Sequence, residues 1–525
     1  IDATDMVASL NTVGMTLKTG ATIKLGSGDT TTTVDGLDLV ADEVKFTDAG
    51  GTDILAATSL GVTNETAIRP NTNGIETFDF DIADDATNTA AAVTFDLRDA
   101  VGLTTFELAV LAASVTALGT TDEAVTVSNL ADGATLALTG ADVNGSIFGS
   151  GAGDVTTVDA AISGASSVTV TNTGAAAALT VYDLTFGTTY TTVTIDQDAE
   201  QDSTFTTAQG TKVTTLNIGG SKSTTAGVAY TDADMDLVTT TFAAATTINI
   251  DANAGDIKFG TTALSAAKLT TLSIVGDKTV AFGGASGSTT TLLEDVNAST
   301  ATGAITFGTS VDFATTSDIA LGTGNDTINL VSTTNTSTTL NMGEKASDND
   351  TLNLTGAMNL GITNVDLSKA DQITQMNGVA DSAVQSGIES IDLSGLTGTY
   401  GAVVTGSADA NTITGSPKAD IINAGGAADT INAKAGEDTI TITDASTDTT
   451  AALKVDTVQV ATGEGFDVIT GFTPGTDKLD LSVTLATDET NKRARDAAGF
   501  GASKALVAAD FVTLDALDLA TTNTT

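Results

Sequence analysis

Apolar residues recur at every second position of this chain, in short runs bounded by Gly, Asn, Asp or Ser. Five clear runs are Ser167–Thr171, Thr191–Ile195, Thr214–Ile218, Thr246–Ile250 and Thr270–Ile274. Alternation with a period of two predicts strands that bury one face, so the pattern predicts an all-β chain. Four of the five runs share the template Thr-Thr-apolar-x-apolar, which indicates either stacked coils of a solenoid or tandem sandwich domains. Helix signals are few and short, at residues 100–117, 261–268, 379–387 and 497–510.

The charged residues restrict the partners that this chain can have. Its 525 residues include 20 Lys and Arg against 66 Asp and Glu, a net charge of −46. Such a charge argues against binding nucleic acid or docking on an anionic bilayer, because both require basic surface. It favours bound cations, which would relieve the self-repulsion of the chain. No run reaches the ~18 apolar residues of a membrane helix, so no transmembrane segment is expected.

The absent residue types restrict the chemistry further. The chain has no Cys and no His, which removes disulfides, thiolates, the usual general base and the common ligands of zinc. Only oxygen ligands are abundant, and these suit hard cations such as Ca²⁺. Zinc proteases and Ser–His–Asp lipases are therefore excluded, and we expect a protein that is not an enzyme. A polysaccharide lyase on a β-helix is a weaker alternative, because Tyr is scarce and Trp is absent.

From Gly406 the sequence becomes periodic, with four adjacent nonapeptides: GSADANTIT, GSPKADIIN, AGGAADTIN and AKAGEDTIT. One position in them is always Asx, occupied by Asn411, Asp420, Asp429 and Asp438. Two residues later the apolar residue is always Ile. A six-residue turn followed by a three-residue strand makes half of a flattened coil, so residues eighteen apart share an edge. Asp420 and Asp438 are therefore expected on one edge, and Asn411 and Asp429 on the other. Carboxylates stacked ~5 Å apart repel each other unless a cation lies between them.

These nonapeptides resemble the RTX repeat of type I-secreted proteins, G-G-x-G-x-D-x-U-x, which forms a parallel β-roll. Better copies lie outside the adjacent run. They place Gly322, Gly324 and Asp326 in LGTGNDTIN, Asp348 and Asp350 in KASDNDTLN, and Gly463, Gly465 and Asp467 in TGEGFDVIT. The segment FDVITGFTPGTDKLDLS at 466–482 also resembles the element that ends many RTX blocks. The resemblance implies that these eight residues, together with Asn411, Asp420, Asp429 and Asp438 of the adjacent run, bind calcium.

Departures from the repeat weaken this calcium hypothesis within the run. Most turns there lack Gly, and Lys418 and Lys434 each occupy a turn. Gly suits a turn in which φ is positive, and a Lys opposes bound calcium. The alternative is that the nonapeptides are coils held by Ile stacking and Asx turns without metal.

Acidity, richness in Ala, Thr, Gly and Asp, and the absence of Cys make the chain similar to calcium-dependent surface-layer (S-layer) proteins of Gram-negative bacteria. This resemblance implies a secreted structural protein of the cell surface that self-assembles into a calcium-stabilised lattice. A homo-oligomeric lattice or filament is the expected partner, with cell-surface lipopolysaccharide or glycan as a further candidate. The alternative is an RTX-type adhesin or an extracellular matrix or filament protein that binds surface carbohydrate.

We expect five regions. They are a β-rich domain (1–150), a β-rich solenoid-like region (151–320), a β-solenoid with isolated calcium nonapeptides (321–405), an RTX-like β-roll (406–482) and a C-terminal tail (483–525). The C-terminal part is thus predicted to be a β-solenoid or parallel β-roll, and the N-terminal part to be β-rich, solenoid or sandwich-like.

Overall fold

The computed structural model describes the chain in segments. They are residues 1–3, 5, 10–11, 19–34, 39, 44–61, 67–83, 93–110, 124–140, 155–160, 167–172, 180–197, 203–220, 234–283, 293–309, 311, 313–343, 348–442, 455–460, 467–473 and 476–481. The chain divides into two compact units, the first of residues 1–314 and 320–324 and the second of residues 315–319 and 325–525. Strand β27 (Phe313–Ala320) contains residues of both.

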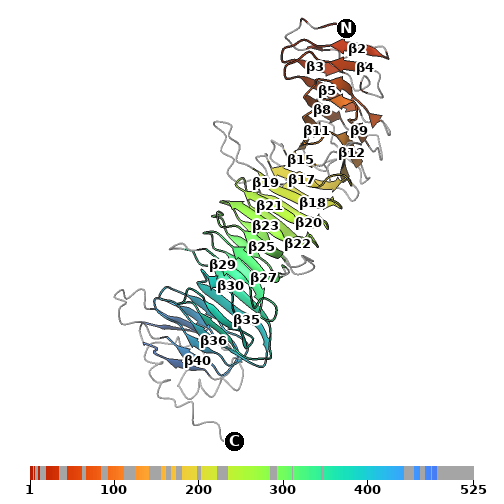
Figure 1. Cartoon of the computed structure of the whole chain (residues 1–525). Helices are drawn as coiled ribbons and strands as arrows, with labels where there is room; N and C mark the ends of the chain where they lie inside the picture. Colours follow the sequence, from red (N-terminus) through yellow and green to blue (C-terminus); the bar gives the residue numbers. More distant parts are fainter. Residues whose placement is uncertain are drawn as a thin grey trace, which may run out of the picture. The chain divides into compact units, whose positions relative to one another are not determined.

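The first unit consists of parallel strands that alternate between two long sheets. Within each sheet, successive strands are hydrogen-bonded neighbours, as the stacked arrows of Figure 1 show. One sheet contains β1 (Leu10–Asn11), β3 (Thr31–Val34), β5 (Ile54–Gly61), β8 (Thr77–Ala83), β11 (Thr105–Val110), β13 (Thr135–Gly140), β15 (Ser167–Asn172), β17 (Thr192–Gln197), β19 (Thr215–Gly220), β21 (Thr247–Ala252), β23 (Thr271–Gly276) and β25 (Leu293–Asn297). The other contains β6 (Ala67–Ile68), β9 (Val93–Asp96), β12 (Ala124–Leu130), β14 (Val155–Ala160), β16 (Thr180–Phe186), β18 (Ser203–Gly210), β20 (Met235–Thr241), β22 (Ile257–Ser265), β24 (Val280–Phe282) and β26 (Ile305–Phe307). A short third sheet is formed by β2 (Ala21–Lys24), β4 (Val44–Thr47), β7 (Asn71–Asn73) and β10 (Ala100–Val101).

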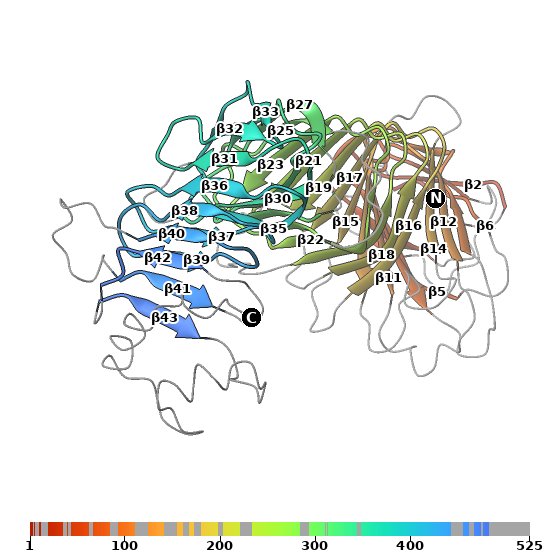
Figure 2. The ribbon, with the colours of Figure 1, turned by 90° about the horizontal axis from the view of Figure 1, so that it is seen from below.

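The second unit repeats this design. One sheet contains β28 (Thr327–Val331), β30 (Thr351–Met358), β35 (Ser390–Gly398), β37 (Thr412–Thr414), β39 (Thr430–Asn432), β41 (Thr457–Val460) and β43 (Lys478–Leu481). The opposite sheet contains β31 (Thr363–Asp366), β32 (Ile373–Met376), β33 (Val379–Ala380), β36 (Ala402–Thr405), β38 (Ile421–Asn423), β40 (Thr439–Thr441) and β42 (Val468–Thr470), and β29 (Thr339–Asn341) pairs with β34 (Gln385–Ser386). Figure 2 shows β36 to β43 as two rows of stacked strands. Only β31, β32 and β33 pair in antiparallel fashion among the described registers.

Identical positions stack from coil to coil and form the core. In the first unit Leu216 pairs in register with Ile248, and Ile248 with Leu272, all of them buried. Phe259 and Phe282 stack with ring centroids 4.7 Å apart. The outward positions carry polar side chains that also stack, since Asn249 Nδ2 donates to Asn217 Oδ1 at 2.8 Å. Alternation thus buries a continuous apolar column, and each coil needs its neighbours for stability.

The predicted all-β fold is confirmed, because no described residue lies in an α-helix and the strands form parallel stacks. The five alternating runs are the neighbouring strands β15, β17, β19, β21 and β23. Parallel pairing agrees with a solenoid and excludes antiparallel sandwiches for the described strands. The short helix signals at 100–110, 261–268 and 379–387 were wrong, because these residues contribute to β10, β11, β22 and β33. Residues 111–117 and 497–510 lie outside the described segments, and the five-region division stays a prediction.

Candidate cation sites on the carboxylate ladders

An acidic or amide residue stands immediately before almost every strand of the second unit's repeat, and these side chains form two ladders. We define the first ladder as Asp326, Asp350, Glu389, Asn411, Asp429, Asp456 and Asp477, which precede β28, β30, β35, β37, β39, β41 and β43. The second ladder is Asp420, Asp438 and Asp467, which precede β38, β40 and β42. Apart from Glu389 and Asp467, all of these residues are buried.

Each rung is a hydrogen bond between successive coils. At most rungs the backbone N–H of one ladder residue donates to a side-chain oxygen of the next, whereas between Glu389 and Asn411 the Asn411 side-chain amide donates to the Glu389 carbonyl at 2.9 Å. In the second ladder, Asp420 N donates to Asp438 Oδ1 at 2.7 Å, and Asp438 N donates to Asp467 Oδ1 at 3.1 Å. In the first, Asn411 N donates to Asp429 Oδ1 at 2.8 Å. The rungs bring together the predicted pairs on two separate edges, and the register of β37 with β39 and of β38 with β40 gives the predicted eighteen-residue coil.

We call a rung closed when both oxygens of its carboxylate accept hydrogen bonds, with donors supplied by the turn that precedes it. Asp420 Oδ2 accepts the N–H of Ser416 at 2.6 Å, and its Oδ1 accepts the Ser416 hydroxyl at 2.8 Å and the Ala402 N–H at 2.6 Å. Asp477 Oδ2 likewise accepts the N–H of Thr473, four residues earlier, at 2.6 Å. These donors stabilise the carboxylate without a metal ion.

We call a rung open when one oxygen of its buried carboxylate accepts no hydrogen bond. Asp438 Oδ2 and Asp350 Oδ2 are buried and accept no hydrogen bond. In the turn before Asp438, the residue four positions earlier is Lys434, which has a positive φ of 68°. Its N–H donates to Asn432 Oδ1 at 3.2 Å instead of to the carboxylate. A buried carboxylate oxygen without a partner requires a proton or a cation.

The pKa values of the ladder carboxylates differ between open and closed rungs. Burial, with repulsion from Asp326, Glu389 and Asp348, raises the pKa of Asp350 to about 8, although the N–H of Asp326 opposes the shift. Burial also raises the pKa of Asp438 to about 7, and Asp420 and Asp467 add repulsion.

For Asp420, burial raises the pKa only to about 6, because its several donors favour the charged form. The open rungs therefore resist ionisation more than the closed rung does.

These residues fit calcium. Asp438 with Asp467, and Asp350 with Asp348, offer carboxylate oxygens to a hard cation. No three acidic side chains gather into a metal cluster in the part of the chain that the structure describes, so backbone carbonyls and water would complete each ligand set. A bound calcium ion would satisfy the open oxygens and neutralise the repulsion between rungs.

The predicted glycines act by a different mechanism from the one expected. Gly322 and Gly324 lie in the first unit, where an added Cβ would lie 1.8 Å from Ala301 O and 2.3 Å from Gly303 O respectively. Their role is close packing of coils, not a positive φ. Asp326 lies in the second unit as a buried rung. Gly463 and Gly465 lie outside the described residues, and the metal-ligand roles of all twelve residues stay predictions.

Sequence reasoning missed that the same ladder occurs in the first unit. Thr30 N donates to Asp53 Oδ1 at 2.8 Å, and Asp53 N donates to Glu76 Oε2 at 2.9 Å. Further along, the bonds run in the opposite direction, because Asp256 N donates to Asp234 Oδ1 of the preceding coil at 3.0 Å. An acidic residue directly before a strand is the signal that could have found these rungs, together with Glu389, Asp456 and Asp477.

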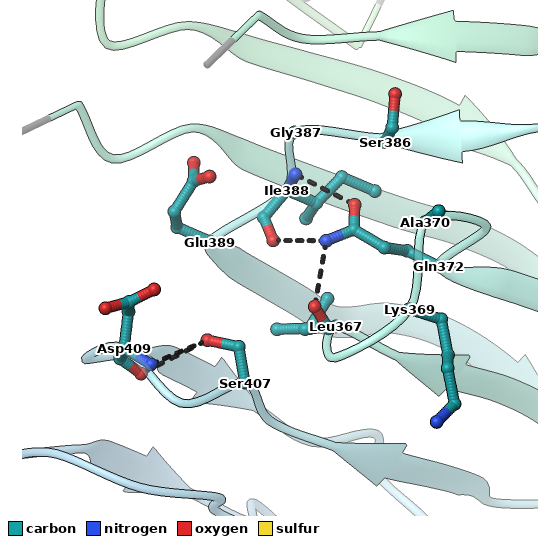
Figure 3. Close-up of a pocket in the computed structure, with 10 residues that line it drawn as sticks. All are labelled: Leu367, Lys369, Ala370, Gln372, Ser386, Gly387, Ile388, Glu389, Ser407 and Asp409. Atoms are coloured by element: carbon teal, nitrogen blue, oxygen red, sulfur yellow. Dashed lines mark hydrogen bonds between the residues drawn. The ribbon is translucent and has the colours of Figure 1, made fainter. Parts of the chain in front are cut away.

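A hollow of about 430 Å³ in the second unit lies beside the first ladder (Figure 3). Its floor is formed by Gln372, whose amide donates to Leu367 O at 3.2 Å and to Ile388 O at 3.0 Å, and accepts the Ile388 N–H at 2.9 Å. Glu389 and Asp409 line one side, and Lys369 extends away from them (Figure 3). Because the Gln372 amide is fully paired, it links two loops and is not free to bind a ligand.

The fold and the ladders define a parallel β-solenoid whose acidic turns suit calcium. Residues 405–440 match the family of the RTX calcium-binding nonapeptide repeat, in four copies. This match supports an RTX-type calcium-binding repeat protein, and such repeats imply an extracellular, secreted protein. Comparison with curated proteins and with solved structures finds no match. In the described segments, no helix has the length and apolarity to cross a bilayer.

Proposed function

We propose that this protein is the non-enzymatic structural subunit of a surface layer, which folds on meeting calcium outside the cell and assembles into a lattice. The observation that carries the proposal is the open rung at Asp438, a buried carboxylate with one unpaired oxygen inside the matched repeat. Without a cation, this oxygen opposes folding at neutral pH. Calcium would therefore act as the folding signal after secretion.

The magnitude is sufficient for such a switch. Calcium at 100 times its Kd stabilises a folded site by ~2.7 kcal/mol, and extracellular modules bind with Kd of ~10⁻⁴ to 10⁻³ M. Two open rungs would together contribute about 5 kcal/mol, comparable with the stability of a whole domain. A chain with net charge −46 would remain extended where calcium is scarce.

Assembly is supported by the kind of surface that the solenoid presents. Apolar side chains are exposed along the second unit, among them Ile421, which is 57% exposed, and Val468, which is 60% exposed. Both precede the central Ile of their own three-residue strands, β38 and β42, so they project outward from one sheet. In register, the exposed Thr439 of β40 lies between them, so the two apolar side chains stand in one exposed row. Exposed apolar groups gathered on one face of a charged protein suit contact between protein copies.

The test is calcium-dependent assembly of the full chain. We expect EGTA-treated protein to scatter little light, and added calcium to produce ordered two-dimensional arrays visible by negative-stain microscopy. An Ile421→Asp, Val468→Asp variant should fold with calcium and fail to form arrays. Arrays that form equally in EGTA, or a folded chain that stays monomeric at high concentration in calcium, would exclude the lattice.

A carbohydrate-binding adhesin is the second candidate, and one observation favours it. A groove of about 280 Å³ in the first unit is lined by residues of β17, β19, β21 and β23, which include the polar Asp196, Asn249 and Asp251 as well as Ile218, Ile250 and Val275. Carboxylate and amide groups in a row suit the hydroxyl groups of a glycan. Binding of purified surface glycans to the calcium-loaded monomer, lost in Asn249→Ala, would favour this function.

A further inference from the structure

The turn between β4 and β5, with the sequence DAGGTD at 48–53, repeats the geometry of an open rung far from the matched repeat. Asp53 stands directly before β5, and its Oδ1 accepts the N–H of Thr30 at 2.8 Å. Its own N–H donates to Glu76 Oε2 at 2.9 Å. Asp350 has the same two bonds, from Asp326 N at 2.7 Å and to Glu389 Oε2 at 2.9 Å. The two turns are therefore equivalent in the ladder.

Two unpaired oxygens distinguish this turn. The Asp53 side chain is fully buried, and its Oδ2 accepts no hydrogen bond. Asp48, at the start of the same turn, has a buried Oδ1 that also accepts none. Burial raises the pKa of Asp53, although Thr30 opposes the shift, and repulsion from Asp48 adds to it. Asp48 Oδ2 accepts the N–H of Gly50, and Asp53 Oδ1 also accepts the Thr30 hydroxyl at 2.5 Å. Neither carboxylate has a Lys or Arg partner among the ion pairs of the described residues, so no cationic side chain neutralises the two charges there.

The backbone of the turn also suits a cation. Gly50 and Gly51 have positive φ values of 133° and 123°, a conformation that side chains disfavour. A Cβ on Gly51 would lie 2.9 Å from Gly28 O and 2.8 Å from Gly28 C. Two successive glycines thus keep the turn free of side chains where it packs on the backbone of the preceding coil. Backbone carbonyls are accessible ligands in such a turn.

Another rung of the first unit shows how the chain neutralises such charges when it supplies a cation itself. Lys258 Nζ lies 3.0 Å from Asp234 Oδ2 and 3.9 Å from Asp256 Oδ2. Asp256 Oδ1 accepts the N–H of Thr279 in the following coil at 2.8 Å, whereas Asp53 Oδ1 accepts that of Thr30 in the preceding coil. At this rung the ammonium group of Lys258 therefore takes the place that a bound cation would have between the two carboxylates. Among the described residues, no Lys or Arg side chain forms an ion pair with Asp48 or Asp53.

We propose that the turn 48–53 binds a calcium ion through Asp48 Oδ1 and Asp53 Oδ2, with backbone carbonyls and water as further ligands. Calcium fits better than magnesium, because a loop of carbonyls and two carboxylates offers a loose oxygen shell, whereas magnesium demands near-ideal octahedral geometry. This site does not depend on calcium binding by the nonapeptides. It would make folding of the N-terminal coils calcium-dependent in its own right.

The test is hydrogen exchange of the full chain, read in peptides that cover residues 44–57, with and without 10 mM calcium. Calcium at 100 times its Kd should slow exchange through local opening by up to about 100-fold in the wild type. We expect Asp48→Asn, at a partly exposed position, and Asp53→Asn to abolish this protection. Unchanged exchange in the wild type, or full protection in both variants, overturns the proposal.

Two further variants keep this outcome separate from the proposed function. Asp256→Asn is the matched control, because its rung already has Lys258, and it should leave the calcium effect at 44–57 intact. Asp438→Asn removes an open rung of the matched repeat and should also leave that effect intact, while it changes the exchange of residues 406–442. Loss of protection at 44–57 in either control would show that the effect does not arise in this turn, and it would overturn the proposal.

Discussion

Replacing Asp438 by Asn should raise stability without calcium and lower it with calcium. In EGTA at pH 8, Asp438 is mostly ionised although burial raises its pKa to about 7. A shift of about three units from 3.8 corresponds to a penalty of about 4 kcal/mol for the charged form. Asn removes this charge and keeps an oxygen for the N–H of Asp420. Because the structure relaxes around a buried charge, we expect a gain of ~1–2 kcal/mol.

Calcium reverses the order of stability of the wild type and Asp438→Asn. Wild-type protein gains ~2.7 kcal/mol from a site at 100 times its Kd, whereas Asp438→Asn forfeits that gain. The matched control is Asp420→Asn, in which the new NH₂ group faces the N–H of Ser416 or Ala402. Opposed donors should cost ~1–3 kcal/mol in EGTA and in calcium alike. The assay is urea unfolding followed by circular dichroism, with hydrogen exchange of residues 406–442. Equal losses for both variants in EGTA would refute the distinction between open and closed rungs.

Three further outcomes follow from the same geometry. In EGTA the free energy of unfolding should fall as pH rises from about 4 to about 8, because folded Asp350 (pKa about 8) retains a proton that the unfolded chain releases near 3.8. Asp350→Asn should make the free energy of unfolding, measured with urea, less dependent on pH. A free energy of unfolding that rises with pH in the wild type would contradict this. Ile431→Ala, at a fully buried position, should cost ~2–5 kcal/mol with or without calcium by urea unfolding. Lys258→Met should lower the free energy of unfolding by less than ~1 kcal/mol, because the Lys258 side chain is 44% exposed. In this variant, hydrogen exchange in β22 should be slower in calcium than in EGTA, and the same difference should be smaller in the wild type.

The repeat at 406–441 could be predicted in detail because its period is constant. Nine residues per half-coil fix which Asx residues share an edge, and the recurring Ile fixes which position faces the core. The structure confirms both, with Ile422 in register with Ile440 and Asp420 bonded to Asp438. A constant period makes the register of neighbouring coils a matter of counting.

Elsewhere the ladder could not be predicted by counting. Its rungs join residues 23 apart at Asp53 and Glu76, 24 apart at Asp326 and Asp350, and 39 apart at Asp350 and Glu389. Turns of variable length separate these residues, so no fixed spacing reveals them.

Local propensity also misled at residues 261–265, where an Ala-containing stretch continues β22. Pairing of Thr262 with Thr239 of β20 extends the strand there. Hydrogen bonds to the neighbouring coil outweigh a weak local preference for helix.

The position of Lys434 shows why loss of Gly from the repeat does not by itself decide whether a turn binds metal. Its φ of 68° is one that Gly would adopt more easily, yet the turn forms and leaves Asp438 open. In the preceding turn on the same edge, Ser416 closes Asp420 with two donors. What decides the need for a cation is therefore whether the residue four positions before the acid directs its N–H at the carboxylate. Where that N–H points elsewhere and no Lys side chain approaches, the carboxylate must take a proton or an ion from solution.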